Sequence, residues 1–159
     1  MKKLLDLTGT WTEFQKLYPA GMDTIRNHFG KSFAIRGNYA AACAPGEKVN
    51  DSACGVFCIF KYNGEKWARD TMFQARSLAP GYFEFARSVS KNGNTIAVGS
   101  TTSVYIYALS NGHWVFQTLV NHKYSNHGFG YYGYGSSVWC SYHSLLAGAN
   151  DDSDMGSMS

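Results

Sequence analysis

Three stretches of the chain share one pattern of apolar and polar positions. The first is residues 29–45 (FGKSFAIRGNYAAACAP), and altered copies stand at residues 85–101 and 134–150. Each copy opens with an aromatic residue and a small residue, and a serine follows two positions later. The aligned residues are Phe29, Phe85 and Tyr134; Gly30, Ala86 and Gly135; and Ser32, Ser88 and Ser137. Repetition of strand-like segments about every fifty residues is typical of a propeller or another repeat array.

Each repeat is predicted to contain four strands separated by turn residues. The strands expected in the first repeat are residues 32–36, 39–44, 56–60 and a last strand that starts near Trp67. Residues 56–60 (VFCIF) are apolar on both faces, so this strand must be covered on both sides, as it would be between stacked sheets. Asn63-Gly64 predicts a hairpin into the last strand, because this pair supplies the positive φ angles of a type I′ turn.

The second repeat follows the same plan. Its expected strands are residues 88–91, 95–99, 104–107 and 114–120, with Asn111-Gly112 as the turn before the last strand. A tryptophan recurs in register at the start of each last strand. The core residues that this pattern predicts are Trp11, Trp67, Trp114, Phe29 and Phe85.

The two ends of the chain complement each other in this scheme. Thr8 to Trp11 aligns with Asn111 to Trp114, so residues 2–7 and 11–17 are expected to be the third and fourth strands of a blade. Residues 134–150 would supply only first and second strands. The chain is thus divided into residues 1–28 (half a blade), 29–84 (a blade), 85–133 (a blade) and 134–159 (half a blade).

This all-β chain therefore holds three blades' worth of four antiparallel strands, whereas closed propellers have about 4 to 8 blades. Unpaired strand edges aggregate unless another strand covers them. We expect each split blade to be completed between chains, which gives a head-to-tail homodimer of six blades. The alternative is a fragment of a longer propeller, or one subunit among neighbouring subunits of a larger assembly.

Composition supports packed strands and narrows the possible partners. Aromatic residues make up 16% of the chain, Gly outnumbers Pro by 17 to 3, and charged residues reach 16% where about 25% is usual. A scattered net charge of +3 argues against a nucleic-acid partner. Apolar runs are too short to span a bilayer, and Asp6 interrupts the only stretch that resembles a secretory signal. We therefore expect no membrane insertion, an intracellular location and buried free thiols at the four cysteines.

The motifs of the first repeat resemble the FG-GAP repeat, which forms the propeller blades of integrin α subunits. The matching residues are Phe29-Gly30-x-Ser32, Ala44-Pro45, Gly55-Val56-Phe57-x-Ile59-Phe60 and Trp67. The later repeats match through Val98-Gly99-Ser100 and Ala147-Gly148-Ala149. The resemblance covers nearly the whole chain and implies a β-propeller that works by binding. Many members hold calcium in an aspartate-rich loop between the first two strands, but the matching loops here are short and lack carboxylates.

Two groups of residues are candidates for ligand binding. Asn150, Asp152 and Asp154 have the alternating oxygen spacing of a calcium loop, although Gly156 is one place late and no glutamate follows. An acidic loop without bound metal is the alternative. Tyr131, Tyr132 and Tyr134 could stack on a sugar or a peptide, or could fill the connection between blades.

The sequence contains no local motif that predicts catalysis or a cofactor. The recurring serines Ser32, Ser88 and Ser137 are expected to bond the backbone at the start of each inner strand, and no phosphate-binding glycine loop is present. We therefore expect a non-catalytic interaction or structural module that self-assembles. The alternatives are a propeller hydrolase or lyase that acts at the central channel, and a carbohydrate-binding or calcium-binding module.

Overall fold

The described part of the chain consists of strands and their connections. The computed structural model describes residues 12–19, 21–22, 27–49, 52–53, 55–74, 85–121 and 133–149. These residues form antiparallel sheets and contain no helix, which confirms the all-β prediction. Accordingly, none of them belongs to a helix that could cross a membrane.

The first sheet corresponds to the first repeat. Its strands are β1 (Phe33–Arg36), β2 (Tyr39–Ala44), β5 (Val56–Tyr62) and β6 (Trp67–Gln74), which pair in this order. A small hairpin of β3 (Lys48–Val49) and β4 (Ser52–Ala53) stands in the connection between β2 and β5. The four strands thus form a meander in which each strand pairs with its neighbours in the repeat.

The second sheet repeats this order, and a third sheet repeats its first half. The second sheet comprises β7 (Ser88–Asn92), β8 (Thr95–Gly99), β9 (Ser103–Ser110) and β10 (His113–Asn121). The third comprises β11 (Tyr134–Cys140) and β12 (Leu145–Ala149). The register is equivalent in the second and third sheets, because Ser88 lies opposite Gly99 and Ser137 lies opposite Gly148. The repeats seen in the sequence are therefore repeats of the structure.

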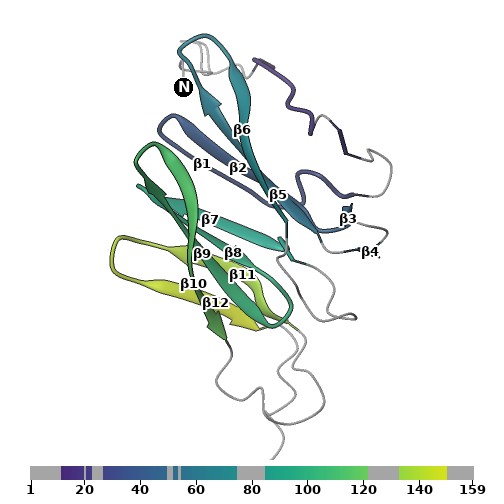
Figure 1. Ribbon diagram of the computed structural model, residues 1–159, viewed down its shortest axis with the longest axis vertical. Helices are drawn as coiled ribbons and strands as arrows, with labels where there is room; N and C mark the ends of the chain where they lie inside the picture. Colours follow the sequence, from purple (N-terminus) through teal and green to yellow (C-terminus); the bar gives the residue numbers. More distant parts are fainter. Residues whose placement is uncertain are drawn as a thin grey trace, which may run out of the picture.

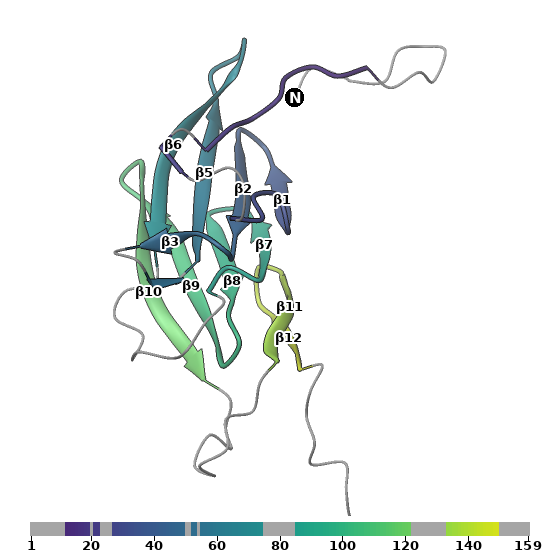
Figure 2. The ribbon, with the colours of Figure 1, turned by 90° about the vertical axis from the view of Figure 1, so that its right-hand side faces the viewer.

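The three sheets are stacked one upon another along the longest axis of the molecule (Figure 1). Figure 2 shows the first strand of each sheet, β1, β7 and β11, along one side and the last strands β6 and β10 along the other. Strand β7 contacts both β1 and β11. The described residues form an open stack and not a closed ring, so the propeller remains a prediction for an assembly.

Apolar side chains on both faces of each full sheet hold the stack together. Phe57 lies between the first two sheets. The centroid of its ring is 5.2 Å from the ring centroid of Phe73, 6.0 Å from that of Phe85 and 4.9 Å from that of Tyr107. The side chains of Ala97 and Val104 project from the opposite face of the second sheet and pack against the third sheet. All five residues of 56–60 are buried, which confirms that this strand is covered on both sides.

The turn at 111–112 agrees with the sequence prediction, whereas at 63–64 the predicted hairpin is present but the predicted type I′ turn is wrong. Asn111 and Gly112 have φ angles of 50° and 81°, as a type I′ turn requires. In the first sheet Tyr62 pairs with Trp67, so residues 63–66 make a longer loop in which only Gly64 has a positive φ. The Asn63 side chain accepts hydrogen bonds from the N–H groups of Glu65 and Lys66, and this stabilises the longer loop.

The strand expected over residues 11–17 is not formed by residues 12–17 in this chain. This segment crosses the face of the first sheet without pairing its backbone to a strand. Among the described residues β6 pairs with β5 alone, and the Gln15 side-chain amide forms hydrogen bonds with the backbone of Trp67 at the start of β6. The strand expected to pair with it, residues 2–7 of the same chain, lies outside the described residues.

Candidate functional site

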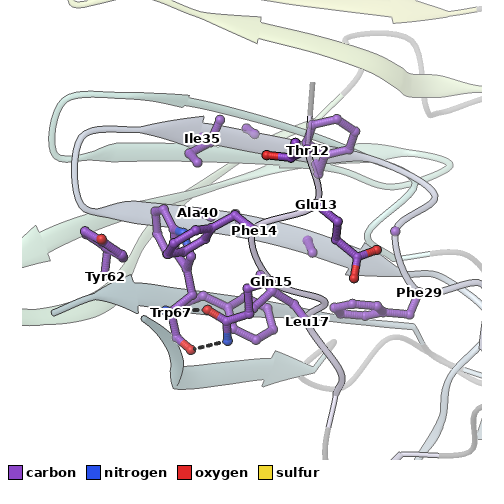
Figure 3. A pocket seen from close by; sticks show the side chains of 16 residues that line it. Thr12, Glu13, Phe14, Gln15, Leu17, Phe29, Ile35, Ala40, Tyr62 and Trp67 are labelled. Carbon is purple, nitrogen blue, oxygen red and sulfur yellow. Dashed lines mark hydrogen bonds between the residues drawn. The ribbon is translucent and has the colours of Figure 1, made fainter. Parts of the chain in front are cut away.

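A cavity of about 470 Å³ lies on the face of the first sheet that points away from the second sheet (Figure 3). Its floor is made by the small side chains of Ala40 and Ala42 on β2. Phe60 and Trp67 line it from β5 and β6. The cavity exists because the two alanines that face this side of β2 leave the middle of the sheet without bulk.

Residues 12–17 form one wall of the cavity. The Gln15 amide donates a 2.9 Å hydrogen bond to the carbonyl oxygen of Trp67 and accepts a 2.8 Å bond from the Trp67 N–H. The ring of Phe14 meets Tyr62 edge-on at 6.3 Å, and Leu17 packs against the same cluster. These contacts hold the segment over β5 and β6, the outer half of the sheet.

The inner half of the same face is open to solvent. Phe33 is 74% exposed and Ile35 is 45% exposed, although both are large apolar residues on β1. The equivalent of Phe33 in the second repeat is Val89, which is buried against the first sheet. Within the described part of the chain, no sheet covers this face of the first sheet as the first sheet covers the second.

A second apolar surface lies at the opposite end of the stack. Trp139 and Leu146 are cross-strand partners on β11 and β12 and are 54% and 64% exposed. Their neighbours Val138 and Ala147 point the other way and pack against the second sheet. Both ends of the stack thus present apolar side chains.

The described lining of the cavity is mostly apolar. Among the described residues that line the cavity, Glu13 is the one with a charged side chain, and it is exposed. Within the described residues no group of three His, Cys, Asp or Glu side chains could hold a metal ion. Burial raises the pKa of Cys58 to about 11, and burial also raises the pKa of Cys43, so both thiols are protonated at neutral pH. The geometry suits the binding of apolar side chains.

The recurring serines connect one repeat to the next. Ser32 accepts a 3.0 Å hydrogen bond from the N–H of Val89, and Ser88 donates a 2.8 Å bond to the carbonyl oxygen of Gly135. The sequence predicted bonds to the backbone, and the structure shows that the backbone belongs to the following repeat. Ser137, the third member of the series, is exposed.

Four of the five predicted core residues lie within the described residues. Trp67, Trp114 and Phe85 are buried, and Phe29 is partly buried and meets Phe60 edge-on at 6.1 Å. Cys43, Cys58 and Cys140 are buried free thiols, as expected.

The predicted ligand-binding residues lie almost entirely outside the described residues. These are Asn150, Asp152, Asp154, Tyr131 and Tyr132, together with the core residue Trp11. Tyr134 is described. It is half-buried and packs against the cluster of Ala97 and Val104, which favours its role in filling the connection between repeats.

The sequence reasoning missed the two apolar end surfaces. A signal for one of them was present in the alignment of the repeats. The third repeat has Trp139 where the first has Ala34, and Leu146 where the first has Ala41. Because two small residues of the first repeat are replaced by two large ones in the third, this face of the third sheet is expected to pack against a differently shaped surface.

Comparisons of the chain with protein-family models, with curated proteins and with solved structures find no match.

Proposed function

We propose that this protein is a non-catalytic propeller module of the FG-GAP type, which acts as a structural or interaction subunit and assembles with itself. In this proposal the half blade of residues 134–159 in one copy is completed by residues 1–28 of the next copy. Two copies in head-to-tail order make a ring of six blades, which lies within the usual range.

The observation that carries the proposal is the pair of uncovered apolar surfaces at the two ends of the stack. Between the sheets of one chain Val89, the equivalent of Phe33, is buried, whereas Phe33 and Trp139 at the ends are 74% and 54% exposed. Burial of apolar surface contributes roughly 25 cal/mol per Å², so each end is stabilised by a further sheet. A ring provides that sheet at both ends at once.

The edge of the third sheet supports the same proposal. Among the described residues, β12 pairs with β11 and with no other strand. The corresponding strands β2 and β8 each pair on both sides. A strand supplied by another copy would complete the ladder and remove an edge that is prone to aggregation.

The non-catalytic part of the proposal is supported by the content of the cavity. Aromatic and alanine side chains make up most of its described lining, and among those residues Glu13 alone has a charged side chain. A surface of this kind recognises shape and apolar area.

The mass in solution tests the proposal. Sedimentation or light scattering of the purified chain at micromolar concentration is expected to give twice the mass of one 17.6 kDa chain. Electron microscopy of the same sample is expected to show rings of six blades. A folded monomer across the concentration series would refute self-assembly, and rings of another blade number would refute the dimer.

A further inference from the structure

The two interfaces inside the chain follow one rule, which identifies the missing third interface. At each interface, a residue in the first two strands of one repeat packs against the next repeat. The residues that it meets there lie one position away from its own equivalent in the alignment. Ala34 and Ala41 of the first sheet belong to the cluster that contains Val89, Ile96 and Val98 of the second sheet. A cluster of side chains from both sheets likewise joins the second sheet to the third.

The same positions recur at that second interface. Ala97, the equivalent of Ala41, is fully buried against the third sheet. Val138 and Leu145, the equivalents of Val89 and Ile96, pack against it. Ser90, the equivalent of Ala34, accepts a 3.0 Å hydrogen bond from the N–H of Cys140.

At the two ends of the stack, both sets of positions are left without a neighbouring sheet. The positions that face the next repeat are Trp139 and Leu146 in the third sheet. The positions that face the preceding repeat are Phe33, Ala40 and Ala42 in the first sheet, and all three line the cavity. The rule places these two surfaces against each other, which requires two copies of the chain.

We propose that Trp139 and Leu146 of one copy dock into the alanine-floored cavity of a second copy. This inference rests on the proposed self-assembly and specifies the surfaces that join. Inside the chain, the small residues Ala41 and Ala97 face the larger Ile96 and Leu145. At the docking surface the large residues belong to the third sheet, and the small residues that they meet, Ala40 and Ala42, belong to the first sheet of the second copy. This exchange of large and small residues keeps the packed volume similar, as close packing demands.

The environment of Gly30 supports this arrangement. Gly30 and its equivalent Gly135 have the same left-handed backbone, with φ angles of 85° and 86°. A Cβ on Gly135 would lie 2.7 Å from the carbonyl oxygen of Ser100 in the preceding repeat, whereas a Cβ on Gly30 would meet nothing within 4 Å. The space before Gly30 is therefore free for the third sheet of another copy.

Ser137 completes the docking surface. Ser32 and Ser88 each bond to the backbone of the following repeat, at Val89 and Gly135. The aligned positions in the first repeat are Phe33 and Gly30. Ser137 of one copy would therefore bond the Phe33 N–H or the Gly30 carbonyl oxygen of the second copy.

The position of residues 12–17 is compatible with this docking. They cover Tyr62 and Trp67 in the outer half of the face, which is where the last strand of a preceding blade would lie. In the inner half, Phe33 and Ile35 of β1 are 74% and 45% exposed, so β11 and β12 of the second copy can reach them.

Complementation between two variants tests the inference. Leu146→Asp alters the docking residues and Phe33→Asp alters the cavity rim, and both positions are exposed enough to accept the change in the folded chain. Each variant alone is expected to sediment as a monomer, with a dissociation constant raised at least about 30-fold. In an equimolar mixture, the unaltered docking residues of the Phe33→Asp chain can meet the unaltered cavity of the Leu146→Asp chain. The mixture is therefore expected to form a heterodimer that is held by this one intact interface. Leu119→Asp, at an exposed leucine of β10, is the matched control and should keep the mass of the unaltered chain.

The outcomes separate this inference from the proposal on which it rests. If the unaltered chain is a monomer, self-assembly is wrong and the docking fails with it. If the unaltered chain is a dimer and both variants remain dimers, self-assembly stands and the docking surface is wrong. Two monomeric variants that do not recombine would also overturn the head-to-tail docking. Circular dichroism checks folding, and Leu146→Ser with Phe33→Ser replaces the pair if either aspartate variant unfolds.

Discussion

Gly99 is the position where the contact between repeats leaves the least room. A Cβ added there would lie 2.0 Å from the carbonyl oxygen of Gly135 and 2.4 Å from the Ser88 hydroxyl oxygen. Backbone atoms cannot move aside as a side chain can, so Gly99→Ala must displace the start of β11. The displacement also breaks the buried 2.8 Å hydrogen bond between Ser88 and Gly135.

The expected cost follows from these two effects. Overpacking of a tight interior costs about 1–3 kcal/mol, and leaving a buried hydrogen-bonding group unpaired costs about 1–3 kcal/mol. Replacement of glycine within a strand returns about 0.5–1 kcal/mol. We therefore expect Gly99→Ala to lower the free energy of unfolding by about 3 kcal/mol, and Tm by roughly 6–12 °C in a chain of this size.

Gly148→Ala is the matched control, because Gly148 is the aligned position in the third repeat. A Cβ there would approach only the Ser137 side chain, with the hydroxyl oxygen at 2.3 Å. Ser137 is exposed and can rotate away, so the expected change is within about 0.5 kcal/mol. Urea unfolding, followed by tryptophan fluorescence in a Leu146→Ala background that suppresses self-association, measures both variants. Equal stabilities for the two would show that the contact between Gly99 and Gly135 does not hold the third sheet.

Two further predictions concern the core and the thiols. Phe57→Ala removes a fully buried ring from the interface of the first two sheets and should cost about 3–5 kcal/mol, whereas Phe33→Ala in the same background should change the free energy of unfolding by less than about 0.5 kcal/mol. Similar urea midpoints for these two variants would contradict the assignment of the core. Folding raises the pKa of Cys58 from 9.0 to about 11 and also raises the pKa of Cys43. Protonation of these thiols therefore stabilises the folded chain below pH 9, and this contribution to the free energy of unfolding is lost as the pH rises from about 9 toward 11. Urea unfolding between pH 7 and 10.5 should show a smaller decline for the double variant Cys43→Ala, Cys58→Ala, and an unchanged decline would mean that these thiols do not titrate differently in the two states.

Much of the fold could be predicted from the pattern of residues along the chain. Alternation and turn residues predicted the strands of both full sheets, because side chains of a strand point alternately to its two faces. The doubly apolar run at 56–60 indicated a sheet covered on both sides. Alignment of the repeats also identified the small residue at Gly30, Ala86 and Gly135, and all three have a positive φ.

The sequence by itself determined that this protein is built from repeated antiparallel meanders, since strand periodicity and turn chemistry are local properties. Only the tertiary structure decided which face of each sheet meets which neighbour, and therefore that Trp139 and Phe33 stand exposed at opposite ends of the stack. It also decided that residues 12–17 cross a sheet instead of forming a strand. A strand forms only where another strand offers its free backbone groups, and that depends on what lies beside the segment in space.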